Sequence, residues 1–194
     1  MPLVRALFVR KISGLENIPA KGPCIFAVNH SSYIDPIILG VLLPFYVQNN
    51  VYYIGMKPLE KYWISRIVLG KYLKTLFVNG VVTEAIEKLK QGSFIVIFPE
   101  GGRTQDGELQ KPQGSGTAVI ANAANVPVIP VAIEGTFELW PKYQRLPHVK
   151  KIVEINFCKK IYFRKKNPTR KQMEEFIKTI MQQIAQQLKK RYYY

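Results

Sequence analysis

The chain has 194 residues, enough for one domain with a substantial core, and 47% of them are apolar, which excludes a disordered polypeptide. Its 28 lysines and arginines outnumber 13 aspartates and glutamates, and the net charge of +15 favours nucleic acid, anionic lipid or a phosphorylated substrate as partner. Two cysteines and two histidines are too few for a disulfide framework or a zinc site. We therefore expect no metal, and we expect Cys24 and Cys158, each within an apolar run, to be buried thiols.

Short apolar segments alternate with amphipathic segments along the chain. The apolar segments are typical of buried strands, whereas the amphipathic ones repeat their apolar residues at helical spacing. This alternation predicts an α/β fold with a mixed, largely parallel central sheet flanked by helices. In chain order, strands are predicted at 24–30, 51–55, 75–79, 94–98 and 128–133, with one or two more within 150–163. Helices are predicted from 36, at 59–74, at 83–91, from 115, and at 167–191.

Capping residues predict where three of these helices begin. Asp35 is a good N-cap before Pro36, Thr83 is a candidate cap for the helix at 83–91, and Asn167 precedes a proline that suits a first turn. The last helix carries a long apolar stripe, which we interpret as core packing rather than membrane docking.

No linker or internal repeat divides the chain, so residues 1–194 are predicted to form a single domain. Residues 1–12 could form a short basic amphipathic helix at a membrane interface. The stretch at 59–74 combines Trp63 with lysines, which suits a lipid headgroup region as well as it suits packing. No apolar run approaches the roughly 20 residues that span a bilayer. We therefore expect a peripheral or monotopic protein on the cytoplasmic face of the cell membrane.

Two polar loops follow predicted strands, VNHSSYIDP at 28–36 and FPEGGRT at 98–104. Functional loops of such sheets gather at the carboxyl ends of the strands, so both loops are expected at one edge. In the first loop, His30 could act as a general base if Asp35 fixed its tautomer and balanced its charge. Ser31 and Ser32 lie too close to the histidine backbone to serve as its nucleophile, so the substrate would supply one. The alternative is a polar loop of ordinary turn formers.

The second loop joins a carboxylate, two glycines and a guanidinium. Glycine lets the backbone approach a ligand closely, and the forked donors of Arg103 suit a phosphate. The alternative is a glycine turn with a surface pair between Arg103 and Glu100.

Together the two motifs resemble the PlsC-type glycerolipid acyltransferases, which include 1-acylglycerol-3-phosphate acyltransferases. His30 and Asp35 match the H-x4-D motif, and FPEGGRT matches the family's FPEG-x-R motif with Gly102 where threonine is usual. VPVIPVAIEGT at 126–136 is similar to a further family block, and the resemblance spans residues 14–136.

The resemblance implies acyl transfer from acyl-CoA or acyl carrier protein to a hydroxyl of a lysophospholipid, most readily 1-acylglycerol-3-phosphate, without a cofactor. His30 would deprotonate that hydroxyl, and Asp35 would hold and charge-balance His30. The implied substrate-binding residues are Glu100, Gly101, Gly102, Arg103 and Thr104, with Arg103 on the acceptor phosphate.

One departure from the family pattern leaves alternatives open. Gly80 stands where the family often has an arginine that helps to bind the phosphate. The acceptor could therefore be a different lysolipid or glycerol phosphate, or the protein could be a non-catalytic lipid-binding relative. The charge would permit a nucleic-acid binder, but no helix-turn-helix, RNP, KH or zinc pattern is present, so an anionic membrane surface is the expected partner. His148 has no carboxylate partner nearby and is interpreted as a surface residue.

Overall fold

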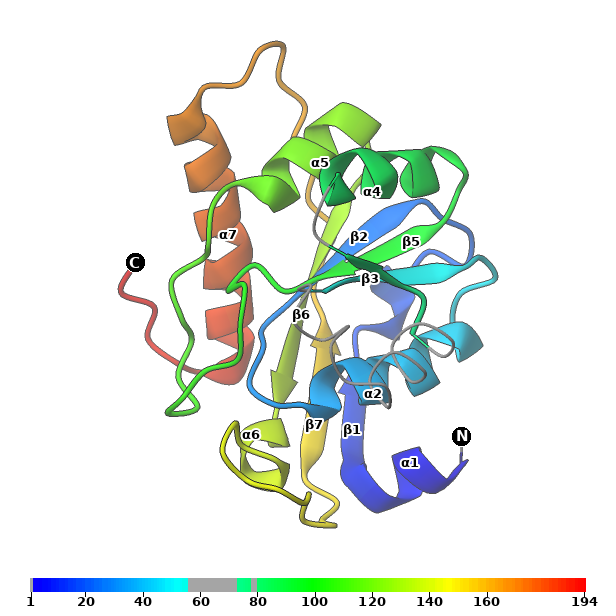
Figure 1. The fold of residues 1–194 in the computed structure, drawn as a ribbon, viewed down its shortest axis with the longest axis vertical. Coiled ribbons are helices and arrows are strands. Elements are labelled where there is room, and N and C mark those ends of the chain that lie inside the picture. The colour runs from blue at the N-terminus through cyan, green and yellow to red at the C-terminus, as the bar shows by residue number, and fades with distance from the viewer. Residues whose placement is uncertain (1, 56–72, 78–79) are drawn as a thin grey trace.

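The computed structural model describes residues 2–55, 73–77 and 80–194 of the chain. In this part of the chain a seven-stranded sheet has the strand order β1-β7-β6-β2-β5-β3-β4 (Figure 1). Neighbouring strands are parallel, except that β6 and β7 are antiparallel. The predicted α/β class with a mixed, largely parallel sheet is confirmed. The strands are β1 (Val9–Ser13), β2 (Cys24–Val28), β3 (Val51–Gly55), β4 (Thr75–Phe77), β5 (Phe94–Ile97), β6 (Val128–Glu134) and β7 (Val153–Phe157).

Helices cover both faces of the sheet (Figure 1). One apolar core lies between the sheet and α4, α5 and α7, and a second lies between the opposite face and α1, α2 and α6. The helices are α1 (Pro2–Phe8), α2 (Ile34–Leu42), α4 (Val81–Lys90), α5 (Gly116–Ala124), α6 (Thr136–Leu139) and α7 (Arg170–Leu188), with short 3-10 turns η1 (Leu15–Asn17) and η2 (Leu43–Phe45).

The central strands are buried on both faces. Along β2, Ile25 enters one core and Phe26 the other, where its ring stacks on Phe94 of β5 with centroids 5.7 Å apart. Burial on both faces explains why these strands are almost continuously apolar in the sequence. Cys24 and Cys158 are buried free thiols, as predicted.

All three predicted helix caps, Asp35, Thr83 and Asn167, are wrong by a few residues. α4 begins before Thr83, directly after Gly80, which adopts a left-handed conformation with φ of 76° that favours glycine. α7 is capped by Thr169, whose hydroxyl accepts a hydrogen bond from the backbone N–H of Gln172 in a capping box. The predicted cap Asn167 lies outside the helix with φ of 53°. Reciprocal side-chain bonding therefore decided where this helix begins.

The N-terminal helix is shorter than the predicted 1–12. It ends at Phe8, because Val9 starts the edge strand β1, which pairs with β7. Val4 and Phe8 pack on the core, whereas Leu3 is exposed.

The apolar stripe of α7 packs on the core, as predicted. Six of its seven predicted members are buried, and Met173 packs partly buried against the same cluster. The predicted helix at 59–74, with Trp63, lies outside the described residues apart from its last two. Among the helices that are described, none combines the length and apolarity needed to cross a bilayer.

Candidate active site

The two polar loops meet at one edge of the sheet, as predicted. β2 and β5 are parallel neighbours, so their carboxyl ends and the loops that follow lie side by side. The loops are bonded to each other, because the backbone N–H of Thr104 donates to the carbonyl of His30 over 3.0 Å. The backbone N–H of His30 in turn donates to the Glu100 carboxylate over 2.7 Å.

His30 and Asp35 form the predicted pair. The distance from His30 Nδ1 to Asp35 Oδ2 is 2.9 Å. Asp35 lies in the first turn of α2, not at the predicted N-cap, and its side chain is fully buried. The same Oδ2 accepts the backbone N–H groups of Ser31 and Ser32, each over 2.8 Å. With Nδ1 donating to this carboxylate, Nε2 of the imidazole is left as the proton acceptor.

Two further residues fix His30 in place. Its ring stacks on Phe98, the first residue after β5, with centroids 4.1 Å apart. The Asn29 side chain bonds both backbone groups of Ile133, donating to its carbonyl over 2.9 Å and accepting from its N–H over 2.8 Å. Asn29 therefore ties the histidine loop to β6. Sequence reasoning missed this role, although an amide side chain at the end of an apolar strand is a signal for such a bond.

Glu100 is a positioning residue in this structure. Both of its carboxylate oxygens accept backbone N–H groups, one from His30 and the other from Gln110 over 2.6 Å. Its side chain is buried, so the carboxylate holds the two loops together. A contact of Glu100 with substrate stays a prediction.

Burial raises the pKa of Glu100 to about 7. The backbone N–H groups of Gln110 and His30 and the charge of Lys190 oppose this shift, while the Asp35 carboxylate adds to it. The folded protein therefore binds this proton more tightly than the unfolded chain does.

We expect Glu100 to make the protein less stable as the pH rises. The unfolded carboxyl loses its proton near its ordinary value of 4.5 and the folded one near 7, so stability falls through this window by an amount on the order of 3 kcal/mol and then levels off. Glu100→Gln should show a smaller loss of unfolding free energy between about pH 5 and pH 8 in denaturant titrations. An equal loss in both proteins would contradict this assignment.

Arg103 lies over an aromatic ring. Its guanidinium carbon is 3.3 Å from the ring centroid of Tyr33, and the Tyr33 ring also contacts Trp140 with centroids 5.2 Å apart. Nη1 of Arg103 is buried and has no hydrogen-bond partner among the described residues. A buried donor without an acceptor is costly, so this nitrogen favours an anionic ligand. Tyr33 was missed in the sequence; an aromatic residue inside the H-x4-D loop was its signal.

The other residues of the second loop shape its backbone. Gly101 has φ of 68°, and a Cβ atom there would come within 2.6 Å of the Gln113 side chain. At Gly102 no atom of the described residues lies within 4 Å of the position that a Cβ would take. Thr104 is buried, and its hydroxyl donates to Asp106 over 2.6 Å. Thr104 therefore stabilises the loop, and its predicted contact with substrate stays a prediction.

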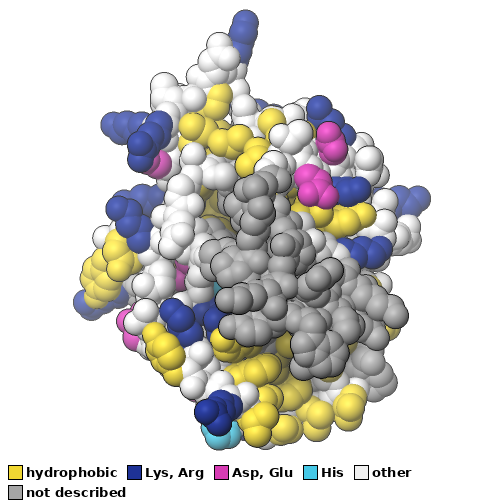
Figure 2. Space-filling view, in the orientation of Figure 1, with side chains coloured by type: hydrophobic (Ala, Val, Ile, Leu, Met, Phe, Trp, Pro, Cys, Tyr) yellow, Lys and Arg dark blue, Asp and Glu magenta, His cyan; other side chains and the backbone are white. Residues whose placement is uncertain are grey.

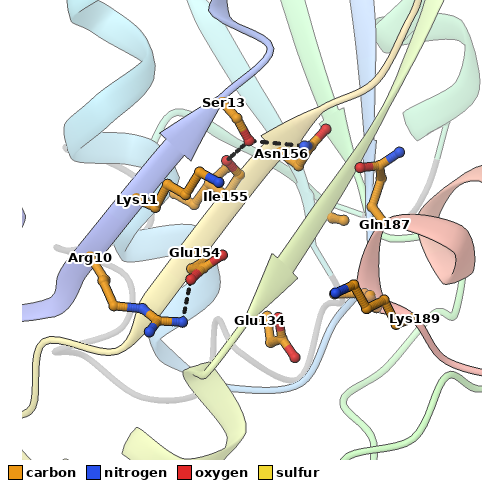
Figure 3. Close-up of a pocket in the computed structure, with 11 residues that line it drawn as sticks. Arg10, Lys11, Ser13, Glu134, Glu154, Ile155, Asn156, Gln187 and Lys189 are labelled. Carbon is orange, nitrogen blue, oxygen red and sulfur yellow. Dashed lines mark hydrogen bonds and ion pairs between the residues drawn. The ribbon is translucent and has the colours of Figure 1, made fainter.

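Two pockets on the molecule are lined by both basic and acidic side chains. A pocket of about 420 Å³ lies between β1, β7 and the end of α7, where Lys11, Lys189 and Glu134 line it and Arg10 pairs with Glu154 (Figure 3). A pocket of about 350 Å³ borders the histidine loop, and its lining carboxylates outnumber its lysine. Within the described ranges, no group of three or more His, Cys, Asp or Glu side chains could hold a metal ion. Arg103 is the one lysine or arginine within the two polar loops at 28–36 and 98–104.

Comparison with known proteins shows the family. Residues 9–134, more than half of the chain, match the family model described as Acyltransferase. The chain belongs to this Acyltransferase family. The matched segment holds both loops of the site, from His30 to Thr104.

Several relatives named as acyltransferases align with similar shares of the chain. This chain is 32% identical over 136 residues to the 1-acyl-sn-glycerol-3-phosphate acyltransferase of Bacillus subtilis. The alignment covers 64% of this chain and 62% of that protein. The chain is 30% identical over 135 residues to the enzyme of that name from Pseudomonas aeruginosa, over 68% and 51% of the two chains. A chloroplastic 1-acyl-sn-glycerol-3-phosphate acyltransferase of Brassica napus is 31% identical over 137 residues, 67% of this chain and 38% of its own. The match thus spans from 38% to 62% of these relatives' lengths.

A solved structure supports the fold assignment. The crystal structure of the 1-acyl-sn-glycerophosphate (LPA) acyltransferase PlsC from Thermotoga maritima matches with a TM-score of 0.74 at 28% identity. The match covers 96% of this chain and 75% of that one. The structural match therefore covers more of the chain than the family model, which matches residues 9–134.

Proposed function

We propose that this protein transfers a fatty acyl group from a thioester, acyl-CoA or acyl carrier protein, to the hydroxyl of 1-acylglycerol-3-phosphate, which yields phosphatidate. The observation that carries the proposal is the pair of His30 Nδ1 and Asp35 Oδ2, 2.9 Å apart, beside an arginine that has an unpartnered nitrogen. The names of the relatives from Bacillus subtilis and Pseudomonas aeruginosa agree with it.

In the proposed reaction the acceptor is the nucleophile. His30 Nε2 takes the proton of the acceptor hydroxyl as its oxygen attacks the thioester carbonyl, and the carbon–sulfur bond then breaks. The thiol leaves with the proton that the imidazolium returns, so His30 ends as it began. Asp35 stabilises the imidazolium between these steps. The Ser32 hydroxyl donates to the Trp140 carbonyl over 2.7 Å, which supports direct transfer without an acyl-enzyme.

Arg103 is proposed to bind the acceptor phosphate. Its planar fork suits bidentate contact with phosphate, and stacking on Tyr33 orients it. Gly80 caps α4 at an exposed position, so it offers no second cation there. With one arginine where the family often has two, a different lysolipid or glycerol phosphate is the alternative acceptor.

A thiol-release assay with purified protein tests the function. Acyl-CoA and acyl carrier protein thioesters would be offered with 1-acylglycerol-3-phosphate, glycerol 3-phosphate or a neutral monoacylglycerol. Free thiol should appear with the first acceptor and not with the neutral one, because the neutral one has no phosphate for Arg103. Release with glycerol 3-phosphate alone would reassign the acceptor. Binding of the lipid without release from any donor would identify a non-catalytic relative.

Arg103→Ala should raise the KM for a phosphorylated acceptor by about ten- to a hundredfold, the effect of one lost hydrogen bond to a charged group. The KM for the acyl donor should change little. Arg164→Ala is the matched control, because Arg164 also stacks on a tyrosine, Tyr162, over 4.4 Å, but belongs to neither polar loop. Steady-state kinetics with each substrate varied in turn measure the effect. A rise in the donor KM instead would assign Arg103 to the thioester carrier.

We also propose that the protein acts at the cytoplasmic face of a membrane, as a peripheral or monotopic protein. The acceptor's acyl chain makes full extraction into water costly, so the enzyme must reach it at the bilayer. The net charge of +15 supports contact with anionic lipid.

A further inference from the structure

The segment between α6 and β7, residues 140–152, carries exposed apolar side chains among basic ones. We call it the α6–β7 loop. Tyr143 and Leu146 are each 75% exposed, and Val149 is 65% exposed. The loop contains no acidic residue and four basic ones, Lys142, Arg145, Lys150 and Lys151. Large apolar side chains gathered on one exposed loop, with polar residues around them, are typical of an interaction site.

The α6–β7 loop is folded, so its exposed side chains are presented on a fixed frame. The backbone N–H of His148 donates to the Leu139 carbonyl over 2.8 Å, which closes the loop on the end of α6. The indole N–H of Trp140 donates to the Gln144 carbonyl over 3.0 Å. The Trp140 carbonyl accepts the hydroxyl of Ser32, which lies between His30 and Asp35. The loop is thereby joined directly to the candidate catalytic loop.

The α6–β7 loop emerges at the edge of the sheet that holds the site. It follows α6, which continues from β6, and β6 runs parallel to β2, whose carboxyl end leads to His30. Figure 1 places α1 at this same end of the molecule, and Leu3 of α1 is 67% exposed. In the same orientation, Figure 2 shows hydrophobic side chains gathered at this lower end with basic ones beside them.

We propose that the α6–β7 loop docks the protein on an anionic lipid bilayer, with Tyr143, Leu146 and Val149 entering the interface and the basic side chains at the headgroups. This rests on the proposed function, and it names the element that meets the membrane. Apolar side chains flanked by cations, without an acidic residue, match the composition of interfacial segments. Charge complementarity favours anionic lipid, at about fivefold in affinity for each cation near the surface.

Docking in this way places the catalytic edge against the headgroups. The acceptor hydroxyl and phosphate lie at that depth in a bilayer, so the acceptor reaches His30 without leaving the lipid entirely. The bond from Ser32 to Trp140 holds the docked loop and the catalytic loop in one frame.

Co-sedimentation of the full chain with vesicles tests the proposal. The vesicles would contain phosphatidylcholine either alone or with about a third of phosphatidylglycerol, an anionic fraction high enough to raise a surface potential. Leu146→Ser with Val149→Ser should lower the partition coefficient about tenfold at low and at high salt, because salt does not screen apolar contact. Lys150→Ser with Lys151→Ser should lower it about tenfold or more on anionic vesicles at low salt, with little effect on neutral ones.

Matched controls separate the loop from general surface effects. Tyr193→Ser removes an exposed ring, 79% exposed, and Lys165→Ser with Lys166→Ser removes two exposed cations from the segment before α7, at the opposite end of the molecule (Figure 1). Both controls should keep partition within about twofold, since charges beyond a Debye length from the surface are screened. The proposal would be overturned if both loop variants kept the partition coefficient of the unmodified protein. It would also be overturned if the control variants lost as much partition as the loop variants. A dimer in solution that only the Leu146 and Val149 changes dissociate would likewise overturn it, because the loop would then contact a second copy.

Thiol release with a short-chain, water-soluble acceptor keeps this test apart from the proposed function. The loop variants should release thiol at the unmodified rate, because Leu146 and Val149 are exposed and belong to neither of the two polar loops. An unmodified protein that binds vesicles through the loop but releases no thiol would refute the activity alone. If the protein is active but the loop variants bind vesicles as well as the unmodified protein does, only the docking proposal is refuted.

Discussion

Replacing His30 by alanine is expected to lower kcat/KM by about a hundredfold to ten-thousandfold, the range contributed by a positioned general base. The reason is that Nδ1 is held by Asp35, which leaves Nε2 as the proton acceptor at the junction of the two loops. Initial rates of thiol release, with the acceptor varied from below its KM to saturation, measure the loss. Far-ultraviolet circular dichroism and a thermal melt check that the variant is folded.

The other histidine provides a matched control. His148 is exposed, and its ring contacts the Gln144 side chain over 2.8 Å, with no carboxylate partner among the residues described. His148→Ala should therefore keep its activity on a water-soluble acceptor. Near-normal thiol release by His30→Ala, or equal losses in the two variants, would remove His30 from the role of base.

Replacing Asp35 by asparagine should slow the reaction by about a hundredfold while the fold is kept. One oxygen of Asp35, Oδ2, accepts from His30 Nδ1, Ser31 N and Ser32 N, and Oδ1 has no partner within the described part of the chain. An asparagine with its carbonyl in the place of Oδ2 keeps all three acceptor contacts and loses only the negative charge. The rate loss therefore measures the stabilisation of the imidazolium.

Comparing Asp35→Ala with Asp35→Asn separates the effect of the lost charge from the effect of the lost hydrogen bonds. Asp35→Ala removes the acceptor of three donors, and each buried donor left unpaired costs about 1–3 kcal/mol. Its melting temperature should fall by several degrees, at about 2–4 °C for each kcal/mol in a domain of this size. If Asp35→Asn were as active as the unmodified protein, Asp35 would serve only to shape the loop.

Three neighbouring residues hold His30 and its loop in one position. Glu100 holds the backbone of His30, Phe98 stacks on its ring, and Asn29 ties its loop to β6. A base held from several sides loses little conformational freedom when the acceptor arrives, which favours an attack geometry that is already formed.

Much of this architecture follows from local sequence patterns. The apolar runs predicted the strands because a strand buried on both faces has no polar position, and the stripe of α7 predicted its packing because helical period alone decides which side is apolar. The pairing of His30 with Asp35 was also predictable from local sequence, since the two residues lie only five positions apart. The placement of the two loops at one edge followed from the parallel strands before them.

The tertiary structure decided the contacts between residues far apart in the chain. The bond from the His30 backbone to Glu100 joins residues 70 apart, and the bond of Asn29 to Ile133 joins residues 104 apart. The same holds for Arg103 on Tyr33, and for the bond that joins Ser32 to the α6–β7 loop. Periodicity and capping rules report which side of an element is apolar and roughly where it ends. They carry no information on which distant polar group satisfies a buried donor, because the order of strands in the sheet sets that choice.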